Sequence, residues 1–333
     1  MPKISVLLPI YNALPYLREA LESILNQSFG DFEVLALDDS STDGSSEYLD
    51  SVNDPRLRVL HLAKAGYTTN LNIGLENARA EIIARMDADD VSLPTRFEKQ
   101  YSFLETNPGH VACSCLVRAI DEAGLLGHIW DYPLEDEAIR FALLHHNPIS
   151  HPGSMFRRDA ALQVGGYRPE YEPSEDYDFW CRMSRVGRLA NLSEVLVHYR
   201  IHPRSVSVSR RELQIDATRR ARVGHAVRLG LAESEDECDA FWRCTPSATE
   251  RPSVHDAVIF GRVASRFLKL LESEGRGLET IAAVRREIRG MFIVLGLRHP
   301  RFTFDRLRLL ALGIGIDPSL RSAFSFPKWA LCR

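Results

Sequence analysis

The chain lacks any apolar run long enough to cross a membrane, since none approaches the roughly 20 residues that a spanning helix requires. It also shows no signal sequence, because an apolar strand pattern begins directly at Ile4. Hydrophobic residues make up 45% and charged residues 26%, as in ordinary folded globular proteins. Together these features predict a cytoplasmic protein.

Cysteine is sparse and scattered. The six residues have neither the spacing of a zinc site nor that of a secreted disulfide framework. Cys113 and Cys115 would place both thiols on one face of a strand, which favours packing in the core over metal ligation. The sequence therefore predicts reduced, unpaired thiols.

Two glycine-rich phosphate-binding motifs are also missing. No Gly-x-Gly-x-x-Gly follows the first predicted strand and no Gly-Lys-Ser/Thr loop occurs, so neither a dinucleotide cofactor nor a P-loop nucleotide is indicated. The stretch after that strand, Pro9-Ile10-Tyr11-Asn12, is not the basic glycine-rich loop with which a nucleotidyltransferase would hold a triphosphate. No nucleic-acid partner is predicted.

The first ninety residues alternate between strand and helix patterns. Apolar runs and helical spacings predict strands at 4–8, 32–37, 57–62 and 82–86, with helices at 14–25 and 70–80. Pro9 is expected to end the pairing of the first strand. This alternation predicts an α/β fold with a Rossmann-like, mostly parallel central sheet flanked by helices, in which ligands bind beyond the carboxyl ends of the strands.

The C-terminal part differs in charge and pattern. Residues 1–210 hold 20 Lys+Arg and 30 Asp+Glu (net -10), whereas 211–333 hold 21 and 15 (net +6). Helical spacing begins near Ser209, so we expect a domain at 1–208 and a helical region at 209–333 that serves acceptor, membrane-surface or oligomer contacts. Basic residues alternate with aromatics over 298–333; they suit either peripheral contact with an anionic membrane surface or a docked helix with solvated charges.

Three carboxylates lie at the end of the fourth predicted strand, in Met86-Asp87-Ala88-Asp89-Asp90. Like charges this close repel one another, and a shared Mg²⁺ or Mn²⁺ would relieve the repulsion because both ions prefer oxygen ligands. Alternatively, Asp90 or Ser92 caps the helix that begins near Pro94.

Polar residues also follow the first two strands, at the edge where the carboxyl ends meet. Tyr11 has a ring that can stack on a base, and Asp38 or Asp39 can accept hydrogen bonds from a base or a ribose. Alternatively, Tyr11 is only a packed residue at the rim, and Asp38 and Asp39 only close a turn. A diphosphate would be repelled here unless a divalent ion lay between it and the carboxylates.

The motifs together resemble those of the family 2 glycosyltransferases, which have the GT-A fold. The resemblance covers about two thirds of the chain and rests on residues 5–12, 37–44, 72–74, 87–90, 151–157, 165–167, 175–178 and 199–202. In one departure, Leu71 stands where many members have an arginine, so Lys64 is the alternative source of positive charge.

The resemblance implies an inverting glycosyltransferase that uses Mn²⁺ or Mg²⁺. It would move a sugar from a UDP- or dTDP-sugar donor to a hydroxyl of a glycan or lipid-linked acceptor, in cell-surface polysaccharide synthesis and, for a lipid-linked acceptor, at the inner face of the membrane. By the family pattern Asp176 is the catalytic base, Asp87, Asp89 and His202 hold the metal, and Glu175 and His151 lie on the acceptor side. The implied donor-binding residues are Pro9, Tyr11, Asn12, Asp38, Asp39, Asn72 and Asp87.

Apolar residues at helical spacing after Glu175 predict that the acidic group at 175–178 opens a helix. The dipole of that helix is expected to lower the pKa of Asp176 and keep it ionised. The alternative is that Asp176 or Asp178 only caps the helix. A non-catalytic protein that binds sugar nucleotides or glycans on the same fold is the competing function.

Overall fold

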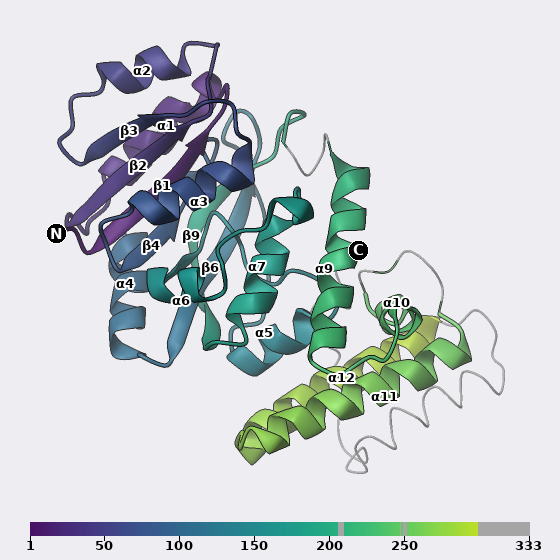
Figure 1. The fold of residues 1–333 in the computed structure, drawn as a ribbon. Coiled ribbons are helices and arrows are strands. Elements are labelled where there is room, and N and C mark those ends of the chain that lie inside the picture. Colours follow the sequence, from purple (N-terminus) through teal and green to yellow (C-terminus); the bar gives the residue numbers. More distant parts are fainter. Residues whose placement is uncertain (206–209, 247, 249–251, 299–333) are drawn as a thin grey trace. The chain divides into compact units, whose positions relative to one another are not determined.

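The computed structural model describes residues 1–205, 210–246, 248 and 252–298, and it divides the chain into two units (Figure 1). The first comprises 1–139 and 147–221, and the second comprises 140–146 and the chain from 222 onward. The boundary at residue 208 stays a prediction.

The first unit is built on a nine-stranded mixed sheet. Its strands are β1 (Ile4–Ile10), β2 (Phe32–Asp38), β3 (Leu57–His61), β4 (Ile82–Arg85), β5 (Val91–Ser92), β6 (His110–Ile120), β7 (Leu126–Trp130), β8 (Met155–Arg157) and β9 (Arg188–Arg200). They lie in the order β3-β2-β1-β4-β8-β6-β9-β5, with β7 on β6. β3, β2, β1 and β4 are parallel, β8 is antiparallel to both neighbours, and β9 is parallel to β6. The expected α/β fold with a Rossmann-like sheet is confirmed.

Pro9 does not end the first strand, contrary to the prediction. β1 continues to Ile10, and Pro9 lies opposite Leu37 of β2. The carbonyl of Leu7 accepts the N–H of Met86 on the β4 side, so the nitrogen of Pro9 also faces that side. Pairing with β4 stops at Leu7, so the missing N–H removes no ladder bond.

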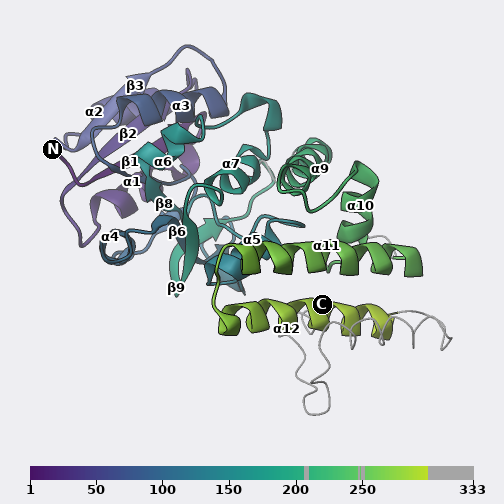
Figure 2. The same cartoon turned by 60° about the horizontal axis from the view of Figure 1, so that its bottom comes forward.

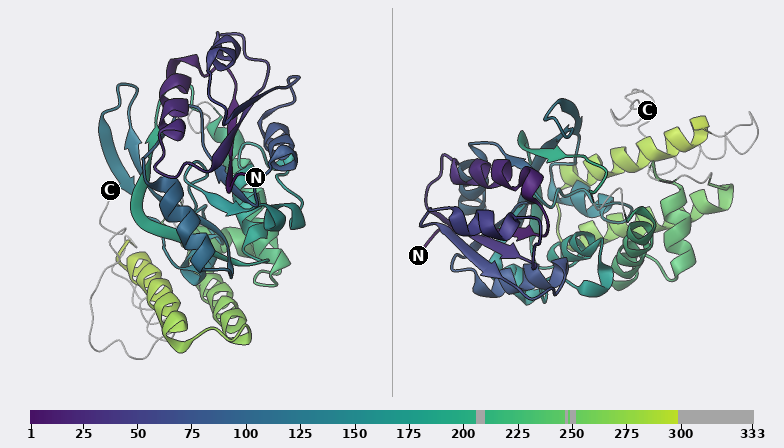
Figure 3. Two further views of the ribbon diagram at one scale, coloured as in Figure 1. Left: turned by 90° about the vertical axis from the view of Figure 1, so that its left-hand side faces the viewer. Right: turned by 90° about the horizontal axis from the view of Figure 1, so that it is seen from above.

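Helices cover both faces of this sheet (Figure 3). They are α1 (Leu14–Leu25), α2 (Ser45–Ser51), α3 (Tyr67–Asn77), α4 (Arg96–Thr106), α5 (Asp136–Ala142), α6 (Arg158–Gln163) and α7 (Glu175–Met183), with a 3-10 turn at Pro169–Tyr171. Val6 and Leu8 of β1 pack in one core with α1 and α4. Leu7 points to the other face, where a Cβ on Gly74 of α3 would lie 2.9 Å from it, so only glycine lets α3 approach this closely.

The second unit is helical, as expected. It holds the end of α9 (Arg211–Arg228), α10 (Glu235–Arg243), α11 (Val254–Ser273) and α12 (Leu278–Arg298), and α11 and α12 lie side by side (Figure 2). Ser253 and Asp256 form a capping box at the start of α11. Phe241 of α10 stacks on Phe260 of α11, with ring centroids 4.8 Å apart, in the core of this unit.

The sequence also predicts the absence of a membrane-spanning segment, a candidate surface contact with a membrane, and unpaired cysteines. Among the described residues, no helix has the length and apolar character needed to span a membrane. The suggested surface contact falls almost entirely in 299–333, outside the described residues. Five cysteines are unpaired, as predicted, and Cys332 lies outside the described part.

Candidate active site

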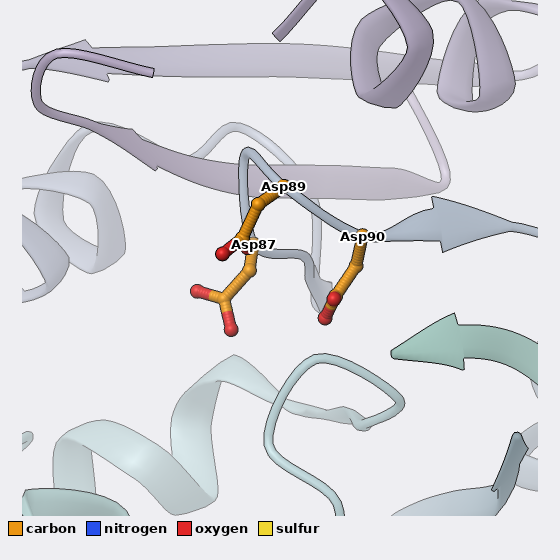
Figure 4. A group of neighbouring side chains, drawn as sticks. All are labelled: Asp87, Asp89 and Asp90. Atoms are coloured by element: carbon orange, nitrogen blue, oxygen red, sulfur yellow. The ribbon is translucent and has the colours of Figure 1, made fainter. Parts of the chain in front are cut away.

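The three aspartates of the predicted metal motif lie together in the loop that joins β4 to β5. One ligand oxygen from each of Asp87, Asp89 and Asp90 lies within 4.8 Å of the others. All three side chains project from the same side of the loop, and those of Asp87 and Asp89 are adjacent (Figure 4). Because parallel β2, β1 and β4 are neighbours, this loop shares a sheet edge with the ends of β1 and β2.

The protein supplies few donors to these carboxylates. Asp90 is 1% exposed; its Oδ1 accepts the backbone N–H of Arg200 at 2.8 Å, and its Oδ2 has no partner among the described residues. Burial, together with the charges of Asp89 and Asp87, raises the pKa of Asp90 well above its usual value. Burial also raises the pKa of Asp87. A buried, unpartnered carboxylate oxygen is a place for a cation or a proton.

Arg85 is the cation that the chain itself places beside this cluster. It is 2% exposed at the end of β4 and forms a close ion pair with Asp87. Its Nε and Nη1 have no partner among the described residues. No role is predicted for Arg85 from the sequence alone, although a charged residue inside an otherwise apolar strand was the available signal.

The predicted metal ligand His202 does reach the cluster from the loop after β9. Its Nε2 lies 2.9 Å from Oδ2 of Asp89, and its ring lies 5.0 Å from that of Tyr16. Carboxylate oxygens and an imidazole nitrogen are ligands that Mn²⁺ accepts, and neighbouring ligand atoms on an octahedral ion lie about 3 Å apart. The residues present therefore fit Mn²⁺ or Mg²⁺.

The alternative of a helix cap is wrong. The helix after the motif, α4, begins at Arg96, and no side chain caps it. Asp90 instead accepts from Arg200, and Ser92 contacts Gln27.

The acidic pair after β2 is used differently. Asp38 accepts the backbone N–H of Ser41 at 3.1 Å on one oxygen, and the Ser46 hydroxyl at 2.6 Å and the His61 ring at 2.9 Å on the other. Burial alone would raise the pKa of Asp38, but these hydrogen bonds outweigh it and hold the pKa below its usual value. Among the described residues, Asp39 accepts only the N–H of Ala65, on Oδ1 at 2.9 Å. Asp38 thus closes the turn, whereas Oδ2 of Asp39 accepts no hydrogen bond from the described residues.

The stretch after β1 lies beside that turn. Asn12 adopts a left-handed backbone, with φ of 51°, and its side-chain oxygen accepts the N–H of Thr42 at 2.8 Å. Tyr11 is 49% exposed, and Lys64 donates to its hydroxyl at 3.0 Å. Tyr11 therefore presents a ring on the surface, with a positive charge beside it.

Asn72 is occupied within the protein. Its amide donates to the carbonyl of Tyr167 and accepts the N–H of the same residue, each at 2.8 Å. The pair fastens α3 to the turn at Gly166, where a Cβ would lie 2.5 Å from the Asn72 oxygen. Leu71 is fully buried, so no charge reaches the site from that position.

Asp176 and Glu175 form the first turn of α7, and no side chain caps this helix. The prediction that the helix dipole lowers the pKa of Asp176 is wrong, because burial raises it to about 6. Arg85 lowers this pKa and Asp87 raises it, so Asp176 lies within electrostatic reach of the acidic cluster. Burial and the charge of Asp176 raise the pKa of Glu175 to about 8.

His151 is buried, and its Nε2 lies 2.9 Å from the hydroxyl of Tyr167. Burial lowers its pKa well below the usual value, so the ring is neutral. Asp178 also lies in the interior, paired with Arg182 one turn along α7. The acceptor-side role of His151 stays a prediction.

The sequence is similar to those of known glycosyltransferases. The family model described as "Glycosyl transferase family 2" matches residues 5–165. An uncharacterized glycosyltransferase of Haemophilus influenzae is 35% identical over 219 residues, which cover 62% of this chain and 68% of that relative. The O-antigen biosynthesis glycosyltransferase WbnJ of Escherichia coli is 33% identical over 214 residues, which cover 62% of this chain and 82% of the relative.

Solved structures share the fold. S. aureus TarS 1-349 in complex with UDP-GlcNAc matches with a TM-score of 0.59 and 17% identity, over 96% of this chain and 91% of that chain. A mannosyltransferase from Pyrobaculum calidifontis, in complex with GDP-Man and Mn2+, matches with a TM-score of 0.53 and 19% identity, over 96% of this chain and 88% of that one. These matches confirm the expected GT-A fold.

Proposed function

Because this chain belongs to glycosyl transferase family 2, we propose that it is an inverting, metal-dependent glycosyltransferase. Its donor would be a UDP- or dTDP-sugar and its acceptor a hydroxyl of a glycan or lipid-linked glycan in cell-surface polysaccharide synthesis. The O-antigen biosynthesis glycosyltransferase among its relatives supports this setting. A lipid-linked acceptor would bring the enzyme to the inner face of the membrane.

The single observation that carries the proposal is that the fold holds two acidic groups with different surroundings: the aspartate cluster at 87–90 and the separate carboxylate of Asp176. Asp87, Asp89 and Asp90 are clustered with an unpartnered buried oxygen, which suits a cation. Asp176 stands apart on α7, within reach of the charge of Asp87, and its pKa is about 6. A general base works best when its pKa lies near the working pH, so Asp176 suits proton transfer.

In the proposed reaction, different residues would bind the donor, hold the metal ion and accept the proton. Asp39 and Tyr11 would contact the base and ribose of the donor, and Asp87, Asp89 and His202 would hold the ion. A bound divalent ion would neutralise the charge that develops on the departing diphosphate. Asp176 would accept the proton of the acceptor hydroxyl. The oxygen of that hydroxyl would at the same time bond to the anomeric carbon of the donor sugar, and the bond between that carbon and the diphosphate would break. One base suffices for this inversion, unlike the carboxylate pair of glycoside hydrolases.

The Asp176→Asn variant tests this assignment. A panel of UDP- and dTDP-sugars, with and without Mn²⁺, first identifies the donor as the compound that raises the melting temperature of the protein most. Release of the nucleoside diphosphate from that donor is then measured, with water as a slow acceptor. We expect Asp176→Asn to reduce this rate to background while calorimetric donor binding with Mn²⁺ persists.

Full activity in this variant would refute Asp176 as the base. If the parent protein binds the donor with Mn²⁺ but never cleaves it, even with glycan acceptors added, the competing function of a binding protein is favoured. Exposed Asp50 offers a matched control, since Asp50→Asn makes the same chemical change away from the acidic cluster.

A further inference from the structure

We propose that Asn147, a residue to which the sequence analysis gave no role, positions the base Asp176 for proton transfer. This inference rests on the proposed function, in which Asp176 is the base. Nδ2 of Asn147 donates a hydrogen bond to Oδ2 of Asp176 at 2.8 Å, across 29 residues of sequence. Asn147 acts through Asp176, so it is a positioning residue.

The orientation of the Asn147 amide is fixed by a second bond. Its Oδ1 accepts the backbone N–H of Ile149 at 3.1 Å. If the amide were flipped, its NH₂ group would face the N–H of Ile149, and its oxygen would face the carboxylate of Asp176. Both contacts would then be repulsive. The side chain must therefore present its donor to Asp176.

The segment that carries Asn147 is anchored to the central sheet. Asn191 of β9 donates to the carbonyl of Pro148 at 3.0 Å and to that of Pro133 at 2.7 Å. Ser114 of β6 donates to the carbonyl of Ser150 at 2.9 Å. The donor of Asn147 is thus held by two strands of the sheet, which is the support that a catalytic group needs to keep its geometry.

Asp176 is held by one donor on each oxygen. Oδ2 accepts from Asn147, and Oδ1 accepts the N–H of Tyr177 at 2.7 Å. A carboxylate held at both oxygens cannot rotate about its Cβ–Cγ bond without breaking a hydrogen bond, so its free lone pairs keep a fixed direction. Displacement of a reacting group by about 1 Å can reduce a rate by roughly 100-fold.

Other charged or titratable groups also act on Asp176. Glu175 is its neighbour on α7, Arg85 and Asp87 belong to β4 and the loop after it, and Tyr132 and Tyr167 lie within electrostatic reach. Only Asn147 among side chains donates a hydrogen bond to Asp176 in the described part of the chain. Its loss should therefore have an effect that these neighbours do not replace.

The informative substitution is Asn147→Asp, because it keeps the size of the side chain and an oxygen for Ile149. It replaces the donor to Asp176 with a second carboxylate. We expect the rate of diphosphate release from the identified donor, with Mn²⁺ and saturating donor, to fall about 10- to 100-fold at pH 7. The acid limb of the pH profile should move to higher pH, while the donor KM changes less than about threefold.

Three controls make the outcome decisive. Asn147→Ala removes the donor without adding a charge and should lose rate with a smaller displacement of the pH profile. Asn77→Asp makes the same chemical change at an exposed amide that bonds only within α3, and should match the parent protein. Calorimetric donor binding and the melting temperature report whether each variant is folded.

Parallel measurement of Asp176→Asn separates the two ideas. If Asp176→Asn keeps its activity, the base is misassigned and the proposed function fails at that point. If Asp176→Asn is inactive, but Asn147→Asp and Asn147→Ala match the parent in rate and pH profile, the positioning role of Asn147 alone is overturned.

Discussion

Two strands of the same sheet end in neighbouring aspartates, and the chain treats the two groups in opposite ways. At the end of β2, Asp38 is surrounded by donors from Ser41, Ser46 and His61, and its pKa is lowered. After β4, Asp90 is equally buried, but it receives one backbone donor and its pKa is strongly raised. Both side chains are 1% exposed, so the difference lies in their surroundings: hydrogen-bond donors lower the pKa of Asp38, whereas the charges of Asp89 and Asp87 add to burial in raising the pKa of Asp90.

This contrast separates a structural carboxylate from one that awaits a ligand. Donors built into a turn satisfy Asp38 permanently, and a ligand would have to displace them. The loop at 87–90 leaves an oxygen of Asp90 without a partner in the described part of the chain and places three like charges together, so an added cation would lower the free energy of the site. Position at a strand end is common to Asp38 and Asp90, whereas only Asp90 of these two has a shortage of donors among the described residues.

The strongest test of the contrast is Asp89→Asn. The variant loses one negative charge and one ligand oxygen from the cluster, and we expect diphosphate release to fall at least about 100-fold, since loss of an outer-shell partner alone costs about 10- to 100-fold. Calorimetric titration with UDP should show no enhancement by Mn²⁺. If the variant binds UDP with Mn²⁺ as the parent protein does, the cluster at 87–90 does not need Asp89 to bind a cation, and the proposed difference from Asp38 is contradicted.

Arg85 tests the electrostatic balance of the same cluster. In Arg85→Met the ion pair with Asp87 is lost, and both Asp87 and Asp176 lose a neighbouring positive charge that lowers their pKa values. We expect activity at pH 7 to fall about tenfold or more, with the acid limb of the pH profile moved upward. Arg85→Lys keeps the charge and should keep that limb near its original position. Equal profiles for both variants would contradict an electrostatic role.

The pH dependence of the unmodified protein gives a smaller effect. Asp176 must be ionised to accept a proton, and its pKa is raised from 3.8 to about 6 by burial. Activity should therefore be lost as the pH falls through 6, with about a tenth remaining at pH 5. The rate of diphosphate release measured between pH 5 and 8, with donor and Mn²⁺ saturating, checks this. A profile that stays flat down to pH 5 would show that burial does not raise the pKa of the base.

The sequence was sufficient where the relevant pattern is local. Alternating apolar runs identified the parallel strands, and the crowded carboxylates at 87–90 identified the cluster. The sequence was insufficient where a contact, a pKa shift or a strand order depends on residues far apart in the chain. The contact of Asn147 with Asp176 spans 29 residues, and the burial that reverses the expected pKa shift of Asp176 is created by the packing around α7. β8 joins the sheet between β4 and β6, an order that the sequence alone does not indicate.

The smallest effect on turnover is expected at Asp38. Asp38→Asn weakens the bonds from Ser46 and His61 in a buried site, so the free energy of unfolding should fall by about 1–3 kcal/mol in urea titration. Donor affinity should change little, because those oxygens are already occupied. The matched variant is Asp39→Asn, which loses only the Ala65 bond within the part of the chain that the structure describes and should weaken donor binding more than it lowers stability. If Asp38→Asn instead loses donor binding at unchanged stability, Asp38 itself serves the ligand and the distinction between Asp38 and Asp90 disappears.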